Sequence, residues 1–290
     1  ACGWQLTWDD IAALSEVIPL LTRLYPNGSA DVNAFHANGG TPAVIDALWR
    51  GELLFTDIET AYGETFDHAR LFPLLEPDNT LGWQQSSDIE KDDAVMKPAH
   101  HPFKPTGGVK LLRGNLGEAI IKVSSLDESK AQNVTAPAIV FESQIDIMEQ
   151  FKKGQLNKDF IAVLPGQGPA ANGMPELHKL TPPLTSLQNQ GFRVALVTDG
   201  RMSGASGKFP AAIHLTPEAV KGGPIGKIQT GDIIRLDWSN DQLVLEVDSA
   251  TLDKRPQYCA QHETPSLGRA LFKNARKNSS PANQGASFIL

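Results

Sequence analysis

A segment dense in glycine, serine and charge, residues 198–208, follows a predicted buried strand. Loops at strand ends often carry catalytic or binding side chains. A nucleophile elbow would need glycine two residues to either side of Ser203, and Arg201 and Ala205 stand there instead, which disfavours a serine hydrolase. The glycine and hydroxyl spacing of a phosphate-binding P-loop is also absent. The residues alone leave two interpretations open, a functional loop and a tight turn with solvated charges.

A second segment, 166–180, also leaves a predicted strand. It carries a carboxylate, an imidazole and an ammonium group at Glu176, His178 and Lys179. Glu176 suits a hard divalent metal, because Mg²⁺ is usually bound through one or two carboxylates and other oxygen ligands. A glutamate at a helix N-terminus, stabilised by the helix dipole, is the alternative.

Short β-rich runs must position both segments, and one amphipathic helix, capped by Ser143 with Asp146 three residues on, interrupts them. Helices do not alternate with every strand, so a β-barrel or sandwich with flanking helices fits better than a doubly wound sheet. The predicted strands are 119–123, 138–141, 161–164, 194–198, 233–236 and 243–247.

The first fifty residues have helical patterns. Thr7 opens a capping box, and apolar residues recur at helical spacing up to residue 26, with Pro19 either kinking one helix or separating two. A further helix is predicted with Thr41 as N-cap and Gly51 as C-terminal stop. The glycines of segment 33–40 precede it, where free backbone N–H groups could face an anion.

Helical periodicity fades between about residues 74 and 108, where proline, aspartate and histidine accumulate. A chain of 290 residues is long enough for one large domain or two ordinary ones. We therefore predict a domain boundary here, with one domain at 1–105 and a second at 106–290.

The composition is that of a globular protein, with 41% hydrophobic and 20% charged residues. Lysine and arginine number 26 against 33 acidic residues, a net charge of -7 that would repel a polyanion, so nucleic acid is not an expected partner. The basic run between Arg269 and Lys277 has two interpretations, a solvated helix face and a binding arm.

No apolar run approaches the roughly 20 residues of a membrane span, so a membrane is not an expected partner either. The first eight residues also lack the pattern of a secretory signal. Cys2 and Cys259 are the only cysteines and have no metal-binding spacing. A reducing, cytoplasmic location is the expectation.

Four motifs occur in a fixed order in the second half of the chain. They are Thr-Asp-Gly-Arg-Met-Ser-Gly at 198–204, Pro-Glu-Ala at 217–219, Gly-Gly-Pro-Ile at 222–225 and Gly-Asp-Ile-Ile at 231–234. Their order and spacing resemble the C-terminal signature of the dihydroxy-acid and phosphogluconate dehydratase family. The segments 25–28, 31–33, 171–180 and 203–208 resemble the phosphogluconate branch.

This resemblance implies dehydration of 6-phospho-D-gluconate to 2-dehydro-3-deoxy-6-phosphogluconate, a hydro-lyase reaction on a small phosphorylated sugar acid. Two alternatives stay open: a dehydratase of another sugar acid or dihydroxy acid, and a non-catalytic binding or assembly module. The resemblance also implies a homodimer.

The family's fold is an α/β domain with the cluster and metal ligands, followed by a β-barrel-like domain. By resemblance, residues 1–105 are the end of the first domain and the rest is the second. The iron-sulfur cluster ligands are then expected upstream of this chain, since neither cysteine matches a cluster motif, and the isolated chain is expected to be inactive. Segment 165–170 departs from the family's commoner Gly-Pro-Lys form, so no lysine contact is assigned there.

The resemblance assigns roles to individual residues. Ser203 matches the family's proposed base, and Glu176 matches a ligand of Mg²⁺ or a similar divalent metal. Because a serine hydroxyl is a poor base at neutral pH, it needs neighbouring positive charge to favour its ionised form, and Arg201, the metal and the cluster are the candidates for that charge.

Contacts to the substrate follow from the need for cationic donors to a phosphate group. The candidates are Lys208, His178 and Lys179, and a solvated surface charge is the alternative for each. Asn33 and His36 are candidates to line the sugar-acid site, although His36 would also suit a packed core position.

Overall fold

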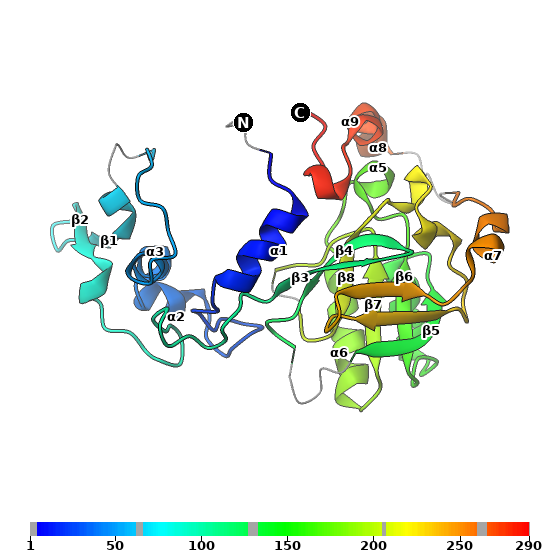
Figure 1. The fold of residues 1–290 in the computed structure, drawn as a ribbon, viewed down its shortest axis with the longest axis horizontal. Coiled ribbons are helices and arrows are strands. Elements are labelled where there is room, and N and C mark those ends of the chain that lie inside the picture. Colours follow the sequence, from blue (N-terminus) through cyan, green and yellow to red (C-terminus); the bar gives the residue numbers. More distant parts are fainter. Residues whose placement is uncertain (1–4, 62–65, 127–132, 205–206, 260–265, 290) are drawn as a thin grey trace. The chain divides into compact units, whose positions relative to one another are not determined.

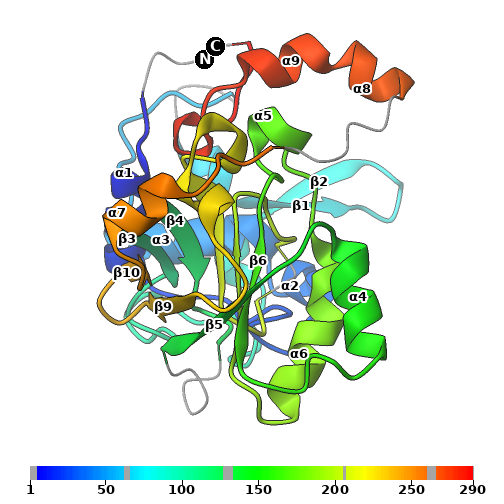
Figure 2. The ribbon, with the colours of Figure 1, turned by 90° about the vertical axis from the view of Figure 1, so that its right-hand side faces the viewer.

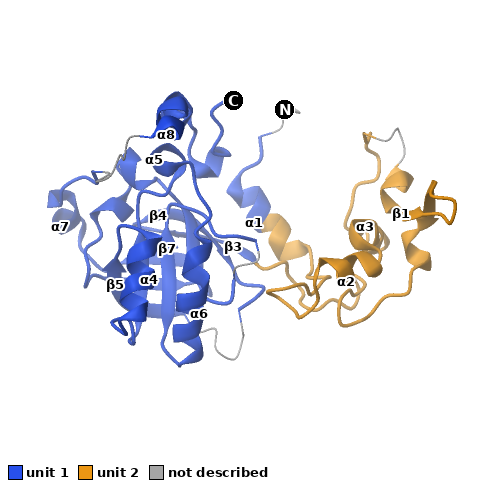
Figure 3. Cartoon of the chain, turned by 180° about the vertical axis from the view of Figure 1, so that it is seen from behind, with its two compact units in different colours: residues 1–12, 109–290 blue, residues 13–108 orange. Residues whose placement is uncertain are grey.

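The structure is a computed structural model that describes residues 5–61, 66–126, 133–204, 207–259 and 266–289 (Figure 1). The chain forms two compact units, residues 1–12 with 109–290 and residues 13–108 (Figure 3). Cys2, Ala205 and Ser206 lie outside the described residues. The predicted domain boundary near residue 105 stays a prediction about the whole protein.

The larger unit is built around a closed barrel of eight strands in the order β10, β3, β4, β8, β7, β6, β5, β9 (Figures 1 and 2). The strands β5 to β8 are parallel to their neighbours within this group, whereas β4 and β9, which flank the group, pair with it antiparallel. The predicted β-barrel with flanking helices is therefore confirmed. The strand bounds are β3 Val109–Gly114, β4 Gly117–Lys122, β5 Val134–Val140, β6 Phe160–Leu164, β7 Val194–Thr198, β8 Ala211–Thr216, β9 Ile233–Asp237 and β10 Gln242–Leu245.

Every residue of β6 and β7 is buried, as expected for strands covered on both faces. Side chains alternate between faces along a strand, so Ile161 and Val163 join the cluster inside the barrel, while Phe160 and Leu164 join an outer cluster. The outer cluster includes residues of α4 (Gln144–Lys152) and α6 (Thr181–Asn189), which lie side by side in Figure 2.

The predicted cap of α4 is confirmed. The Ser143 hydroxyl accepts from the Asp146 backbone N–H at 3.2 Å, and the Asp146 carboxylate accepts from the Ser143 N–H at 2.9 Å. The other described helices of this unit are α5 Pro169–Asn172, α7 Ser249–Lys254, α8 Leu267–Leu271 and α9 Lys273–Asn278, with 3-10 helices at His178–Leu180, Ala219–Lys221, Pro224–Lys227 and Ala282–Gln284.

The described part of residues 13–108 contains α-helical segments, two 3-10 helices and a hairpin. The end of α1 (Trp8–Val17) is followed by α2 (Val32–Ala37) and α3 (Gly40–Arg50), and β1 (Leu71–Leu75) pairs antiparallel with β2 (Leu81–Gln85). Two 3-10 helices, Phe66–Arg70 and Ser86–Asp88, flank the hairpin. Among the described residues of the whole chain, no helix has the length and apolarity needed to cross a bilayer.

Two details of the helical predictions were wrong. The first helix ends before Pro19, as one of the two alternatives had it, but no second helix follows among the described residues up to residue 26. The first helix ends at Val17, and Leu20 and Thr22 then form β-bridges with Lys104 and Met96. Thr41 is not the N-cap of α3, because the helix begins at Gly40 and its cap, two residues earlier than predicted, is Gly39, whose φ of 91° suits glycine.

Candidate functional site

The two predicted functional segments leave the same edge of the barrel, because β6 and β7 are parallel and directly paired up to Leu164 and Thr198. The Thr198 hydroxyl donates to the Leu164 carbonyl at 2.7 Å and accepts from the Gly200 N–H at 3.0 Å. Carboxyl ends of parallel strands are favoured positions for binding sites. The chain therefore brings segments 166–180 and 198–208 together, as their placement after neighbouring strands requires.

The buried carboxylate of Asp199 holds three segments in place. It accepts hydrogen bonds from the backbone N–H groups of Gly166 (3.1 Å), Gln167 (2.8 Å) and Ala219 (2.9 Å). Burial raises the pKa of Asp199 to about 6, although these donors act in the opposite direction. Asp199 thus fixes the loop after β6 against the loop after β7 and the segment after β8.

Glu218 is a second buried carboxylate with a similar role. Its two oxygens accept from the N–H groups of Ala170 and Ala171, both at 3.0 Å. These N–H groups belong to the first turn of α5, where backbone N–H groups have no acceptor within their own helix. Gly168 lies against the Glu218 side chain, where a Cβ would come within 2.4 Å of the carboxylate, so the close approach requires glycine.

Glu176 and Arg201 are brought into direct contact. Arg201 donates from Nη1 to Glu176 Oε1 at 2.9 Å and from Nε to the Met174 carbonyl at 2.8 Å. Their backbones form a parallel β-bridge, and the Leu177 N–H donates to the Arg201 carbonyl at 3.0 Å. Glu176 therefore lies in an extended pairing rather than in a helix, since the following 3-10 helix begins at His178.

Ser203 is half-buried, two residues beyond Arg201 in the same loop. The loop is held from the neighbouring strand by Lys122, at the end of β4, whose Nζ donates to the Gly204 carbonyl at 2.9 Å. Beyond the strand, the Ser125 hydroxyl donates to the Gly207 carbonyl at 2.8 Å. Burial lowers the pKa of Lys122, and among the described residues it has no carboxylate partner.

His214 of β8 is hydrogen-bonded through its backbone to the start of the same loop. Its backbone N–H donates to the Gly200 carbonyl at 2.8 Å, and it holds a φ of 58°. Burial lowers the pKa of His214, and the charge of Arg201 lowers it further, so its imidazole is neutral at neutral pH.

The predicted phosphate contacts lie at exposed positions around this loop pair. His178 and Lys179 occupy the 3-10 helix directly after Glu176, and Lys208 lies at the end of the loop that carries Ser203. Asn33 and His36 belong to α2 in the other unit. There the Asn33 amide donates to Asp31 at 3.3 Å, and the His36 ring lies 4.8 Å from that of Phe72.

The donor groups of the described residues fit one metal ligand and do not fit an iron-sulfur cluster. Within the described ranges, no group of three His, Cys, Asp or Glu side chains is placed to hold a metal ion. Glu176 fits the role of one oxygen ligand, because its carboxylate is 41% exposed and keeps a free oxygen beside Arg201. An iron-sulfur cluster is held by several thiolates, and the described residues contain one free cysteine, Cys259, which does not fit such a site.

Sequence patterns gave no role to Asp199, Glu218, Lys122 or His214. Asp199 and Glu218 lie inside the quoted motifs at 198–204 and 217–219, where acidic residues beside apolar strands are a signal of buried hydrogen bonding. Lys122 interrupts an apolar strand, which is a similar signal. His214 gave none, because β8 itself was not predicted.

Comparison with known proteins gives one consistent family. The model described as dihydroxy-acid/6-phosphogluconate dehydratase C-terminal matches residues 94–286, and its N-terminal counterpart matches residues 1–69. A phosphogluconate dehydratase of Pseudomonas aeruginosa is 46% identical over 287 residues, which cover 99% of the chain and 47% of that protein.

Two further relatives show the range of similarity. The Escherichia coli K12 phosphogluconate dehydratase is 45% identical over 291 residues, 100% of the chain and 48% of that protein. A dihydroxy-acid dehydratase of Acetivibrio thermocellus is 30% identical over 292 residues, with 98% and 48% covered. The chain spans about half the length of the curated relatives it matches.

Proposed function

The chain belongs to the dihydroxy-acid/6-phosphogluconate dehydratase family, and from this we propose that the protein containing it dehydrates 6-phospho-D-gluconate to 2-dehydro-3-deoxy-6-phosphogluconate, the hydro-lyase step of the Entner-Doudoroff pathway. The observation that carries the choice of substrate is the gap between 46% identity to a phosphogluconate dehydratase and 30% to a dihydroxy-acid dehydratase, each over nearly the whole chain.

The reaction removes a proton from C2 and hydroxide from C3, which leave together as water, and the resulting enol becomes the 2-keto product. In this proposal Ser203 accepts the C2 proton. Its position in the loop between β7 and β8, fixed by Asp199 at one end and Lys122 at the other, supports this role. A base fixed before the substrate binds does not have to be ordered during the reaction.

Ser203 must be ionised to act as a base, and nearby positive charge lowers the pKa of a hydroxyl group. Arg201 is the cation that precedes it, but its guanidinium is hydrogen-bonded to the Glu176 carboxylate. Lys122 donates to the carbonyl of the residue after Ser203 and has no carboxylate partner in the described part of the chain. Both cations favour the ionised serine, and Lys122 does so with less of its charge neutralised.

Glu176 is proposed as an oxygen ligand of Mg²⁺ or a similar divalent ion. Such an ion, when bound, neutralises the charge that develops on the substrate carboxylate as the C2 proton leaves. Arg201 then has a second role besides favouring the ionised serine. It orients the Glu176 carboxylate through a 2.9 Å hydrogen bond.

The iron-sulfur cluster of this proposal has its ligands upstream of this chain, because neither Cys2 nor Cys259 lies in a cluster motif and such a cluster is held by several thiolates. His178, Lys179 and Lys208 remain candidates for substrate contacts at the rim of the loop pair, and Asn33 and His36 are candidates from the other unit. A cytoplasmic homodimer completes the proposal.

The test is turnover by the complete enzyme, reconstituted without oxygen. We expect measurable kcat/KM with 6-phospho-D-gluconate and values at least about a hundredfold lower with D-gluconate and with a branched 2,3-dihydroxy acid, because lost contacts to a charged phosphate cost several kcal/mol. Comparable kcat/KM with an unphosphorylated acid would assign the protein to another branch of the family.

A further inference from the structure

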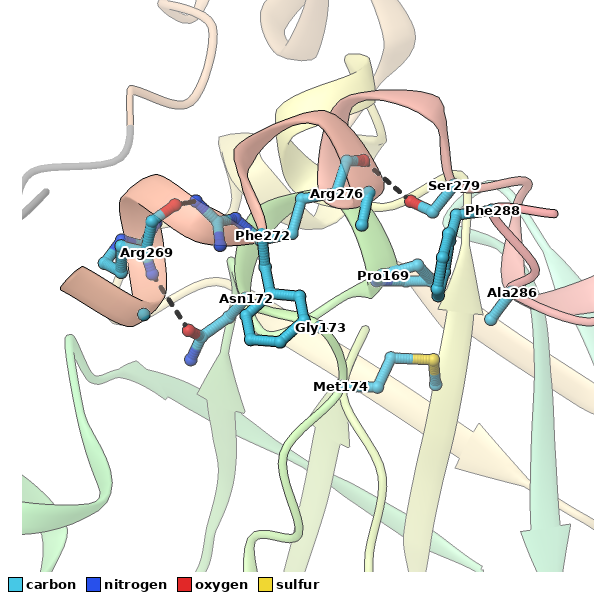
Figure 4. A pocket seen from close by; sticks show the side chains of 12 residues that line it. Pro169, Asn172, Gly173, Met174, Arg269, Phe272, Arg276, Ser279, Ala286 and Phe288 are labelled. Atoms are coloured by element: carbon cyan, nitrogen blue, oxygen red, sulfur yellow. Dashed lines mark hydrogen bonds between the residues drawn. The ribbon is translucent and has the colours of Figure 1, made fainter. Parts of the chain in front are cut away.

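A cavity of about 460 Å³ lies between α5 and the C-terminal segment of the larger unit (Figure 4). Asn172 and Met174 lie on one side, and Arg269, Phe272, Arg276 and Phe288 belong to the C-terminal segment. In Figure 4 the ring of Phe272 extends toward Gly173, and the Arg276 guanidinium lies beside Arg269. None of the residues discussed above as catalytic or metal-binding lines this cavity.

The cavity is positively charged. Among the residues that the structure describes, two arginines line it and no aspartate or glutamate does. The chain from Thr264 to Leu290 contains Arg269, Lys273, Arg276 and Lys277 and no acidic residue, although the whole chain has a net charge of -7. This local excess of positive charge is not explained by the solvated helix face predicted from sequence, because two of the four cations line a cavity.

Arg276 is a cavity-lining cation whose hydrogen bond does not neutralise its charge. Its Nη2 donates to the Arg269 carbonyl at 2.9 Å, a neutral acceptor, and it has no carboxylate partner within the described ranges. Its side chain is half-buried, so an anion there would meet a charge partly shielded from water. Arg269 donates to the Asn172 side-chain oxygen at 3.2 Å, which fixes the C-terminal segment against the end of α5.

The wall formed by residues 172–174 connects this cavity to the Glu176 and Arg201 pair. The Met174 side chain lines the cavity, while the Met174 carbonyl accepts from Arg201 Nε at 2.8 Å. Met174 therefore contacts both the cavity and Arg201, so a ligand with an anionic group at each end would meet a cation on either side of this residue. An acyclic sugar acid with a terminal phosphate has this form, with a phosphate at one end and a carboxylate at the other.

We propose that this cavity binds the terminal phosphate of the substrate, with Arg276 as the main donor and Arg269 beside it. The inference rests on the proposed function for the identity of the substrate. Arginine suits this role because its planar guanidinium can donate two parallel hydrogen bonds to phosphate oxygens. The phosphate contact is thereby assigned to Arg276 in preference to the exposed His178, Lys179 and Lys208.

The test compares Arg276→Gln with Lys277→Gln in the complete enzyme. Lys277 is the adjacent, exposed cation of α9 and does not line the cavity, so the two variants lose the same charge from the same helix. We expect Arg276→Gln to raise KM for 6-phospho-D-gluconate at least about tenfold with little change in kcat, because one charge-assisted hydrogen bond is lost. Lys277→Gln should change KM less than about twofold.

Direct binding of inorganic phosphate, followed by isothermal titration, separates this inference from the proposed function. Arg276→Gln should weaken phosphate binding about tenfold even if the natural substrate is another phosphorylated acid. Arg276→Lys keeps the charge and loses the planar donor pair, so its phosphate affinity should lie between those of the wild type and Arg276→Gln. This variant also serves as the test if the glutamine variant does not fold. Unchanged KM and phosphate affinity in the Arg276 variants, or equal effects in Arg276→Gln and Lys277→Gln, would overturn the assignment.

Discussion

The charge around Ser203 depends on two cations with different contacts. Arg201 forms an ion pair with Glu176 at 2.9 Å, whereas Lys122 donates to the neutral Gly204 carbonyl and is partly shielded from water. A charge acts more strongly on its neighbours when less of it is neutralised and less water screens it. Lys122 is therefore the residue whose ionisation should be most visible in the rate.

Lys122→Met should lower kcat/KM at least about tenfold, because it removes a cation that favours the ionised form of Ser203, the proposed base. Burial lowers the pKa of Lys122, so the wild-type rate should fall on the alkaline side below the ordinary lysine pKa of about 10.4, as this cation is lost. Lys122→Arg should keep most of the activity and move this fall to higher pH. The measurement is a pH profile of kcat/KM for the three proteins.

Lys110→Met, on the adjacent strand β3, is the matched control. Lys110 pairs with Asp241 at 3.1 Å and has no contact with the loop of Ser203 among its described interactions. If Lys122→Met lowered the rate equally at all pH values, and Lys122→Arg did not move the alkaline fall, Lys122 would act only by holding the loop.

At the scale of elements, the site depends on loops tied to one another by buried carboxylates. Asp199 follows β7 and binds the N–H groups of the loop after β6 and the segment after β8. Its carboxylate is fully buried, and its pKa is raised by burial to about 6 in the folded protein, compared with about 3.9 in an unfolded chain. Folding therefore favours its protonated form.

The sign of the resulting pH dependence follows from this pKa. Stabilisation from a protonated Asp199 is complete below about pH 4 and is lost as the pH rises through about 6, a change on the order of 3 kcal/mol in the free energy of unfolding. Asp199→Asn should lack this component. At low pH the variant should have a lower free energy of unfolding than the wild type, because it lacks the hydrogen bonds of the carboxyl group. Between pH 5 and pH 7.5 its free energy of unfolding should fall by less than that of the wild type.

Denaturant unfolding of both proteins at these two pH values measures the difference. The other titrating groups are the same in wild type and variant, so their contributions cancel when the change in free energy of unfolding between the two pH values is compared. An equal pH dependence in the two proteins would show that Asp199 is ionised in the folded state throughout this range.

The strands that carry the site were the most predictable part of the fold. The run 161–164 is apolar at every position, and 194–198 is apolar up to Thr198, because β6 and β7 are buried on both faces, so their composition alone indicates strands. β3 and β8 were not predicted. β3 carries Lys110 and Arg113, and β8 contains His214 with a positive φ, so neither has a regular apolar pattern.

The site itself was only partly predictable. Glu176 and Arg201 lie in loops after parallel strands, which places them at one edge, but their hydrogen bond depends on a β-bridge between two irregular segments. The contact of Lys122 with Gly204 joins residues 82 positions apart across the β4 and β8 pairing, and no local pattern encodes such a pairing. The cavity beside Arg276 likewise depends on where the C-terminal segment packs.

At the scale of the whole molecule, the two units differ in how much apolar surface they bury. Among the described residues of unit 13–108, the buried apolar side chains are Leu21, Ala43, Val95 and Met96, whereas the barrel unit contains two large clusters. A small core gives little free energy against local opening.

Hydrogen exchange of the 290-residue chain should therefore show its slowest amides in β6 and β7 and faster exchange across residues 13–108. The expected difference is at least about a hundredfold in protection, since local opening costs less where few apolar contacts are broken. Mass spectrometry of peptides from the two units measures it. Equal protection in both units would mean that the smaller unit unfolds only together with the barrel.

The central claim is that the loop between β7 and β8 supplies the base for dehydration of the sugar acid. Its most direct test is kcat of Ser203→Ala in the complete enzyme, with iron and divalent metal content measured on the same samples and Ser239→Ala, in the exposed turn after β9, as the control. We predict a loss of about three orders of magnitude or more in kcat for Ser203→Ala, with metal content unchanged and the control near wild type. A near-normal kcat in Ser203→Ala, with the same metal content, would contradict the claim.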